Sequence, residues 1–280
     1  NTFLDEKERE AILVDLKPGD IASIDAVLNR ANELDDPDQL VQIQSDDRMI
    51  EAIVALITKG GEQGIRSGLD IVGRLLPEPG VSVKSDQRSV ASVVGFYRQR
   101  MLALFDPQKG KFDFSAAYEQ FERLQDDYPN QADTFAVRDA LLKLRTDAGA
   151  AQGVRLEQLL TDNKLLPVEG QDDVGDVLDV VRQMVGSQES VELSAILTSP
   201  SISTRYVQAA NLAIDAKDYA GAERVLGAGL RYAPNDPALA NLSRDVLAEL
   251  KRRRDAKRAT EIEIALAPVW PEFASLGDFE

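Results

Sequence analysis

The sequence predicts an all-α fold, and three observations support this prediction. Ala, Leu, Val, Asp, Glu and Arg dominate the chain, which favours helices, whereas aromatic residues make up only 6% of the 280 residues. Apolar residues recur at helical spacing nearly throughout, and no stretch offers several alternating apolar and polar runs of strand length. Glycines and prolines fall between the periodic segments, where they separate one helix from the next.

The periodic segments predict helices that are mostly about three to four turns long and joined by short polar connections. We expect them at 4–15, 20–34, 47–59, 62–76, 87–105, 114–127, 131–147, 154–161, 174–185, 189–198, 203–216, 219–232 and 237–262. The breakers between them are Gly60–Gly61, Pro77 with Pro79, Pro107, Pro129, Pro167 with Gly170, Pro200, and Pro234 with Pro237.

Helices of similar length call for a search for internal repeats. The best self-match pairs DFSAAYEQFERLQDDYPN, at Asp113–Asn130, with DYAGAERVLGAGLRYAPN, at Asp218–Asn235. Both segments begin with an aspartate that can cap a helix, and both end in Pro-Asn. Between these ends they share an aromatic, a small and an apolar position, namely Phe114 and Tyr219, Ala117 and Ala222, and Phe121 and Leu226.

This pattern resembles the second helix of a tetratricopeptide repeat, in which a small residue lets two helices pack closely and a proline ends the unit. The C-terminal copy fits better, because Tyr206 falls where the family has its large aromatic residue. Ala209 and Ala210 fall on the family's close-packing Leu-Gly pair. Two positions depart from the family, since Ala213 replaces a Tyr and Gly229 replaces an Ala.

The resemblance implies one repeat at Thr204–Pro234, followed by a capping helix that begins at Pro237. It implies a tetratricopeptide-like α-solenoid of stacked antiparallel hairpins, irregular in the N-terminal half. We expect four regions: degenerate hairpins at 1–152, connecting helices at 153–200, the repeat and its cap at 201–265, and an aromatic tail or linker at 266–280.

Composition excludes several classes of function. The net charge of -16 opposes binding to nucleic acid and to anionic membranes. No apolar run is long enough to span a membrane. Without histidine or cysteine, the chain lacks the residues of thiolate and imidazole metal sites and of His-based catalysis, so we expect no metal, no cofactor and no enzyme activity. The lack of cysteine favours a periplasm, although many cytosolic proteins also lack it.

Two motifs are open to a ligand-binding interpretation, but simpler structural roles explain them. The segment Lys59–Gly64 with Gly68 lacks the ending of a phosphate-binding loop, so we expect a helix end at Gly60 and close helix packing at Gly64 and Gly68. Pairs and runs of aspartate lack the spacing of a calcium loop, so we expect most of them at helix starts or in solvated turns. They lie at Asp35–Asp38, Asp46–Asp47, Asp126–Asp127 and Asp172–Asp173.

The candidate partner-binding residues come first from the repeat resemblance. The first helix of the implied repeat would line a concave groove. The groove positions of the family fall on Thr204, Val207, Asn211, Ile214 and Asp215. Asn211 is the leading candidate, because an exposed amide can both donate to and accept from a peptide backbone. The alternative is that all five are ordinary surface residues.

Two further candidates lie near the C-terminus. The basic run Lys251–Arg258, with Arg252 and Arg253 at its centre, contrasts with the acidic chain. It is either the solvated end of a long helix or a docking patch for an acidic partner, a second copy of the chain or a lipid head group. Trp270, between two prolines, is expected to pack on the body of the protein or on a partner, unless the tail is a linker.

These observations lead to three functional hypotheses. The first is a scaffold that binds a protein or peptide partner, as the extracytoplasmic part of a larger bacterial envelope or assembly protein. The second is an oligomerisation or linker domain, with the basic run pairing to acidic surfaces of a second copy. The third is a helical enzyme that uses carboxylates, which the missing histidine and cysteine disfavour.

Overall fold

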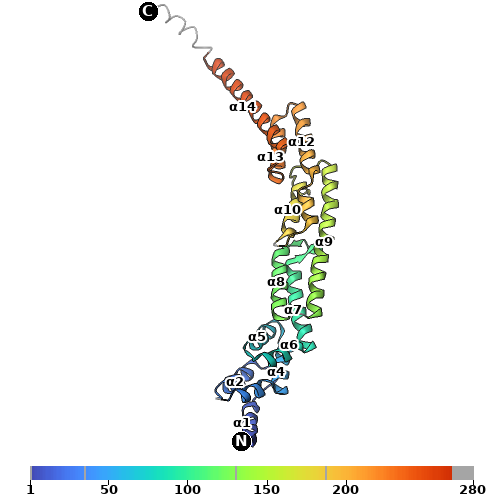
Figure 1. Cartoon of the computed structure of the whole chain (residues 1–280). Helices are drawn as coiled ribbons and strands as arrows, with labels where there is room; N and C mark the ends of the chain where they lie inside the picture. Colours follow the sequence, from blue (N-terminus) through green and yellow to red (C-terminus); the bar gives the residue numbers. More distant parts are fainter. Residues whose placement is uncertain (1, 35, 130, 187, 267–280) are drawn as a thin grey trace, which may run out of the picture. The chain divides into compact units, whose positions relative to one another are not determined.

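The computed structural model confirms the all-α prediction. It describes residues 2–34, 36–129, 131–186 and 188–266, which are helical except for short connections and one two-stranded hairpin. The chain divides into two compact units at Arg145 and Thr146, and each unit is described by itself (Figure 1).

The first unit is built from helices and one small hairpin of strands. Its helices are α1 (Thr2–Leu13), α2 (Ile21–Asn32), α3 (Pro37–Gln44), α4 (Asp47–Lys59), α5 (Gly61–Arg74), α6 (Pro77–Ser85), α7 (Gln87–Leu104), α8 (Phe114–Asp127) and the start of α9 (Ala132–Thr161). Helix α4 lies at the centre of the N-terminal part, because it packs against α2, α3, α5, α6 and α7. Its residues from Ala52 to Ile57 are all buried.

The N-terminal part of this unit repeats with an offset of 40 residues. PDQLVQIQSDDR at 37–48 matches PEPGVSVKSDQR at 77–88, with a shared proline, valine, serine, aspartate and arginine. In both copies a short helix begins at the proline, and the next long helix follows the aspartate. The segment from α3 to the start of α4 therefore recurs 40 residues later as the segment from α6 to the start of α7, and we call each segment with the helices before it a repeat.

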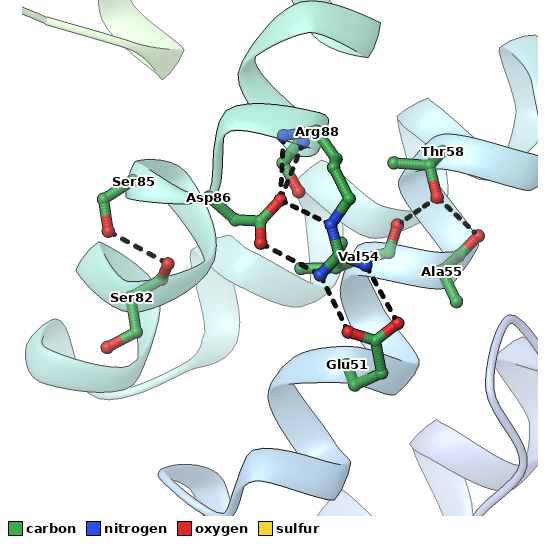
Figure 2. A network of polar contacts seen from close by, with 9 residues as sticks. Glu51, Val54, Ala55, Thr58, Ser82, Ser85, Asp86 and Arg88 are labelled. Carbon is green, nitrogen blue, oxygen red and sulfur yellow. Dashed lines mark hydrogen bonds and ion pairs between the residues drawn. The ribbon is translucent and has the colours of Figure 1, made fainter.

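The shared Asp-x-Arg motif joins each repeat to the one before it. Asp86 caps α7 by accepting from the backbone N–H of Arg88 at 2.9 Å, and the Arg88 guanidinium also donates to Asp86. The same guanidinium donates to both carboxylate oxygens of Glu51 in α4, at 3.1 and 2.8 Å (Figure 2). In the same way, Arg48 donates both to Asp46, which caps α4, and to Glu10, which lies in α1. A bidentate arginine pair constrains orientation as well as distance, so the motif links α7 to α4 and α4 to α1.

Glycines allow α4 and α5 to approach closely, as the sequence predicted. A Cβ atom at Gly64 would overlap the carbonyl oxygen of Leu56, and one at Gly68 would overlap the Ile57 side chain. Gly60 ends α4, and its N–H donates to the Leu56 carbonyl at 3.0 Å. The glycine-rich segment is therefore a packing device between two helices.

A hairpin of short strands connects α7 to α8, in the gap between the helices predicted at 87–105 and 114–127. Strand β1 (Phe105–Asp106) pairs antiparallel with β2 (Lys111–Phe112), around the short 3₁₀ helix Pro107–Lys109. Gly110 closes the turn with a φ of 69°, a left-handed conformation that glycine adopts at little cost. The hairpin turns the chain back, so that α8 packs against α7.

The second unit contains the predicted tetratricopeptide-like segment. Its helices are the C-terminal part of α9, α10 (Val174–Val185), α11 (Val191–Leu197), α12 (Pro200–Asp215), α13 (Tyr219–Tyr232) and α14 (Pro237–Leu266). Helices α12 and α13 form a tightly packed pair, and α14 packs against both of them.

The two segments that matched in sequence also share their local structure. Helices α8 and α13 are each 14 residues long, and each is capped by the predicted aspartate, Asp113 or Asp218. The small residues Ala117 and Ala222 are fully buried in both. Asp236 caps α14 by accepting from the N–H groups of residues 238 and 239.

Some predicted element boundaries were wrong. The sequence placed breaks at Pro77 and Pro200, yet α6 and α12 begin at these residues, because proline at the first helical position needs no N–H partner. The short helix α3 was missed, and it likewise begins at a proline, Pro37. Two helices were expected at 131–147 and 154–161, but the single 30-residue helix α9 covers both.

Candidate partner-binding site

The five groove positions implied by the repeat resemblance lie along one face of α12. Thr204, Asn211 and Asp215 are exposed, and Val207 and Ile214 are half-buried. The fully buried residues of α12 lie on its other side, where they pack against the rest of the unit. The Asn211 amide makes no hydrogen bond within the described part of the chain, so its donor and acceptor remain accessible.

This face is held in place by a close-packed core. Tyr206 of α12 is fully buried, and its hydroxyl donates to the carbonyl oxygen of Leu165 at 2.9 Å. Gly229 of α13 lies against the Tyr206 ring and Leu239 of α14, and a Cβ there would lie only 2.9 Å from Tyr206. Gly229, which departs from the usual alanine, therefore leaves room for the tyrosine where three helices meet.

Arg252 and Arg253 have partners within the second unit. The Nε atom of each guanidinium group lies 2.8 Å from a carboxylate oxygen of Glu249. Arg253 also lies over the ring of Tyr219, with its guanidinium carbon 4.0 Å from the ring centre. Glu249 partly neutralises the charge of these two arginines. They are therefore less able to bind an acidic partner than unpaired cations of the same run would be.

Helix α14 extends to Leu266, four residues beyond its expected end. From Lys251 onward every residue of this helix is exposed. The predicted contact residue Trp270 lies outside the described residues.

The sequence did not indicate a groove in the first unit that runs between α7 and α9. Its volume is about 480 Å³, which is in the size range of ligand pockets. One wall comes from Val94, Met101 and Leu102 of α7. The other wall comes from α9, through Ala136, Val137, Ala140, Leu141 and Leu144. Leu102 is 41% exposed, a large apolar side chain left in contact with water at the edge of an apolar groove.

Two contacts hold α9 beside the α8 segment near the groove. Thr134, near the start of α9, donates to the carbonyl oxygen of Tyr128 at 3.2 Å. Further along α9, the Arg145 guanidinium lies 4.1 Å from the ring centre of Phe114. Both contacts tie α9 to the α8 segment, whereas small residues such as Ala136 and Ala140 leave space on the side of α7.

Charged residues of both signs stand at the groove. Arg98 of α7 and Asp133 of α9 contribute to its lining, and both are exposed. Neither side chain forms an ion pair within the described ranges. The site therefore combines an apolar floor with one free cation and one free anion, which suits an amphipathic ligand better than a uniformly charged one.

A second cleft, of about 430 Å³, lies between α10 and α13 in the second unit. Its charged groups are partly paired, since Asp179 contacts Arg182 at 2.9 Å and Arg231 at 3.5 Å. Both arginines also stack near the ring of Tyr232, and burial raises the pKa of the tyrosine hydroxyl. These contacts join α10 to α13.

A carboxyl and a phenol with shifted pKa values meet between α7 and α8. Tyr97 donates to Asp127 at 2.8 Å, and burial raises the pKa of Asp127 despite this hydrogen bond. Burial also raises the pKa of Tyr97. Shifted pKa values can mark catalytic groups, but neither residue lines the α7–α9 groove or the α10–α13 cleft. The pair is best explained as a link between two packed helices.

Three of the aspartate pairs or runs begin helices, as predicted. Asp36, Asp46 and Asp173 each accept a hydrogen bond from a backbone N–H of the following first turn. Asp173 forms a reciprocal capping box with Asp176. Nowhere in the described ranges do three or more acidic side chains gather into a group that could hold a metal ion.

No protein-family model, curated protein or solved structure matches this chain. Among the described helices, none combines the length and the apolar composition needed to cross a membrane.

Proposed function

We propose that this chain is a helical scaffold that binds a protein partner through the groove between α7 and α9. The observation that carries the proposal is an open apolar groove with an exposed leucine, Leu102, on its wall. Concave and mostly apolar sites of this size are typical binding sites of proteins. The proposal includes a tetratricopeptide-like arrangement of α12, α13 and α14, with the α12 face as an additional contact surface.

The chemistry of the groove favours an amphipathic helix as the ligand. Its α9 wall extends from Asp133 to Leu144, which corresponds to about 17 Å along the helix axis, or three turns. An apolar stripe at positions i, i+3, i+4 and i+7 of a partner helix spans about 10 Å, so a groove of this length has room for it. Arg98 and Asp133 would then select the charges that flank the stripe.

A binding role also fits the chemistry that the chain lacks. Without histidine and cysteine, acid–base and nucleophilic catalysis would depend on carboxylates, lysine, tyrosine or hydroxyl groups. The carboxylates with lowered pKa values, such as Asp46 and Asp86, are engaged by arginines in the repeat motif. We therefore propose a role without catalysis.

The test compares two alanine-to-glutamate variants by quantitative capture of partners on the immobilised chain. Ala140→Glu places a charge in the groove, whereas Ala103→Glu places one on an exposed position of α7 that does not line it. We expect Ala140→Glu to remove the partners that Ala103→Glu retains, with circular dichroism confirming that both variants fold. If the captured proteins are the same for both variants, the groove is not the binding site.

A further inference from the structure

The two helices that form the α10–α13 cleft carry opposite charges toward it. Asp173, Asp176 and Asp179 of α10 line the cleft, and their three-residue spacing places them on one side of that helix. Arg224 and Arg231 of α13 line it as well, seven residues apart and likewise on one side of their helix. The cleft therefore has an acidic wall and a basic wall.

Several of these charges are used within the second unit. Asp173 is buried, and its carboxylate accepts from two backbone N–H groups in the first turn of α10. Asp179 lies 2.9 Å from Arg182 and 3.5 Å from Arg231. These contacts explain the two carboxylates and Arg231 without a ligand.

Two charged side chains of the cleft have capacity left for a ligand. Arg224 is exposed and forms no ion pair or side-chain hydrogen bond within the described ranges, and no acidic residue stands three or four positions from it on α13. The exposed carboxylate of Asp176 accepts from the Asp173 N–H at 3.1 Å through Oδ2, whereas its Oδ1 accepts no hydrogen bond from the described residues. One free cation and one half-used carboxylate thus line the same cleft.

The lining also offers a hydroxyl group and an apolar surface. A Cβ atom at Gly175 would overlap the hydroxyl oxygen of Tyr232, so the glycine lets this tyrosine reach over the start of α10. The hydroxyl makes no hydrogen bond in the part of the chain that the structure describes. The apolar part of the lining consists of Leu165, Leu166, Pro167 and Ala228.

These features favour a small ligand that carries both charges. The volume of about 430 Å³ is near the lower end of the range for ligand pockets. An anion alone would face the carboxylates of α10, and a cation alone would face the arginines of α13. A zwitterion avoids both conflicts, because its carboxylate can pair with Arg224 while its ammonium group pairs with Asp176.

We propose that the α10–α13 cleft binds an apolar amino acid or dipeptide in its zwitterionic form. The ligand carboxylate lies on Arg224, the ammonium group on Asp176, and the apolar side chain against Leu165 and Leu166. This small-molecule site is separate from the α7–α9 groove and goes beyond the partner-binding function proposed above.

The test is an NMR titration of the full ¹⁵N-labelled chain with L-leucine and with L-alanyl-L-leucine. Leucine is compared with two singly charged forms, since N-acetyl-L-leucine keeps only the carboxylate and L-leucine amide keeps only the ammonium group. The backbone N–H of Gly175 reports on the cleft. The N–H of Gly227, on α13 but outside the cleft lining, reports on indirect changes.

Four variants separate the two charges from general effects. Arg224→Gln is compared with Arg244→Gln, a substitution of an exposed arginine of α14 that does not line the cleft. Asp176→Asn removes the opposite charge but keeps an acceptor for the Asp173 N–H. Ala140→Glu is the control for the α7–α9 groove. Circular dichroism confirms that each variant folds.

We expect the better of the two zwitterionic probes to shift Gly175, and leucine to bind at least about tenfold more tightly than either singly charged form. Arg224→Gln should weaken leucine binding about tenfold without affecting leucine amide, and Asp176→Asn should weaken it without affecting N-acetylleucine. Arg244→Gln and Ala140→Glu should change it less than about twofold.

The relative affinities of leucine and alanyl-leucine decide between an amino acid and a dipeptide as the ligand. The proposal is overturned if neither probe shifts Gly175 at concentrations up to about 20 mM. It is also overturned if a singly charged form binds as tightly as leucine, or if Arg224→Gln and Arg244→Gln have equal effects.

Discussion

Gly229 of α13 faces Tyr206 of α12 at a distance that leaves no room for a side chain. A Cβ on residue 229 would lie 2.9 Å from both Cβ and Cγ of the tyrosine, and 3.2 Å from a methyl group of Leu239. Because Tyr206 is fully buried and hydrogen-bonded, it cannot move away without loss of its contacts. The three-helix core of the second unit therefore depends on this glycine.

Gly229→Ala should destabilise the chain by about 1–3 kcal/mol through overpacking. Gly227→Ala is the matched control, since a Cβ at that exposed position of the same helix meets nothing within 4 Å. There the lower backbone entropy of alanine should stabilise the helix by about 0.5–1 kcal/mol. Chemical denaturation measures both changes. Equal effects of the two substitutions would show that the Tyr206 contact is not tight.

The capping role of the repeat motif is tested at Asp46. Asp46→Ala removes the cap of α4 and should cost about 1 kcal/mol at neutral pH. Asp47→Ala, at the next position, removes a first-turn charge without a cap and should cost about half of that or less. Urea denaturation of both variants decides whether the cap or only the local charge stabilises α4.

The cap should also be sensitive to pH. Hydrogen bonds from Arg48 hold the pKa of Asp46 below its ordinary value, so its contribution is present above that ordinary value and is lost as pH falls through the folded-state pKa. The cost of Asp46→Ala should therefore shrink in acid. A cost that stays the same down to pH 2 would contradict the link between the cap and the Arg48 contact.

The buried carboxyl Asp127 should show the opposite dependence. Burial raises its pKa, so its contribution to stability is complete below the ordinary carboxyl pKa and is lost as pH rises through the folded-state pKa. Asp127→Asn keeps an acceptor for the Tyr97 hydroxyl and removes the charge. We expect its melting temperature to exceed that of the wild type by about 1–3 °C at pH 7 and to match it near pH 3. A lower melting temperature at pH 7 would contradict this assignment.

The contact between successive repeats is tested by a double-mutant cycle on Glu51 and Arg88. Both side chains are at least half exposed, so we expect a small favourable coupling that is strongest at low salt. Raising the salt concentration from about 20 to 500 mM should reduce the coupling by about half or more. The Glu10–Arg48 pair, which has the same geometry, should behave alike. If neither pair shows coupling at low salt, the motif does not link the repeats energetically.

Much of the fold could be predicted from local sequence signals. Four helices, among them α4 at 47–59 and α13 at 219–232, have the predicted limits, because an aspartate cap marks each start and apolar periodicity continues to the end. The starts of α3, α6 and α12 at Pro37, Pro77 and Pro200 were not predicted, and the three errors have a common cause. Proline excludes helix before itself but favours the first helical position, and sequence alone does not decide between the two.

The 40-residue repeat was visible in the sequence but was not predicted. The shared Pro-x-x-x-Val-x-x-x-Ser-Asp-x-Arg pattern at 37–48 and 77–88 was available in the sequence, but it spans a helix junction. The α7–α9 groove had no such signal, because Leu102 and Ala140 lie far apart in the sequence and meet only in the folded chain. For the same reason, only the structure shows that Glu249 engages Arg252 and Arg253.

Site-specific photo-crosslinking tests the binding role of the groove most directly. A benzophenone amino acid is placed at Leu102, on the groove wall, and separately at Ala103, which is exposed but does not line the groove. Irradiation in a lysate of the source cells should give a discrete adduct from position 102 alone, mapped to an amphipathic helix of the partner and lost with Ala140→Glu. Equal adducts from both positions, or adducts only between copies of this chain, would contradict the account.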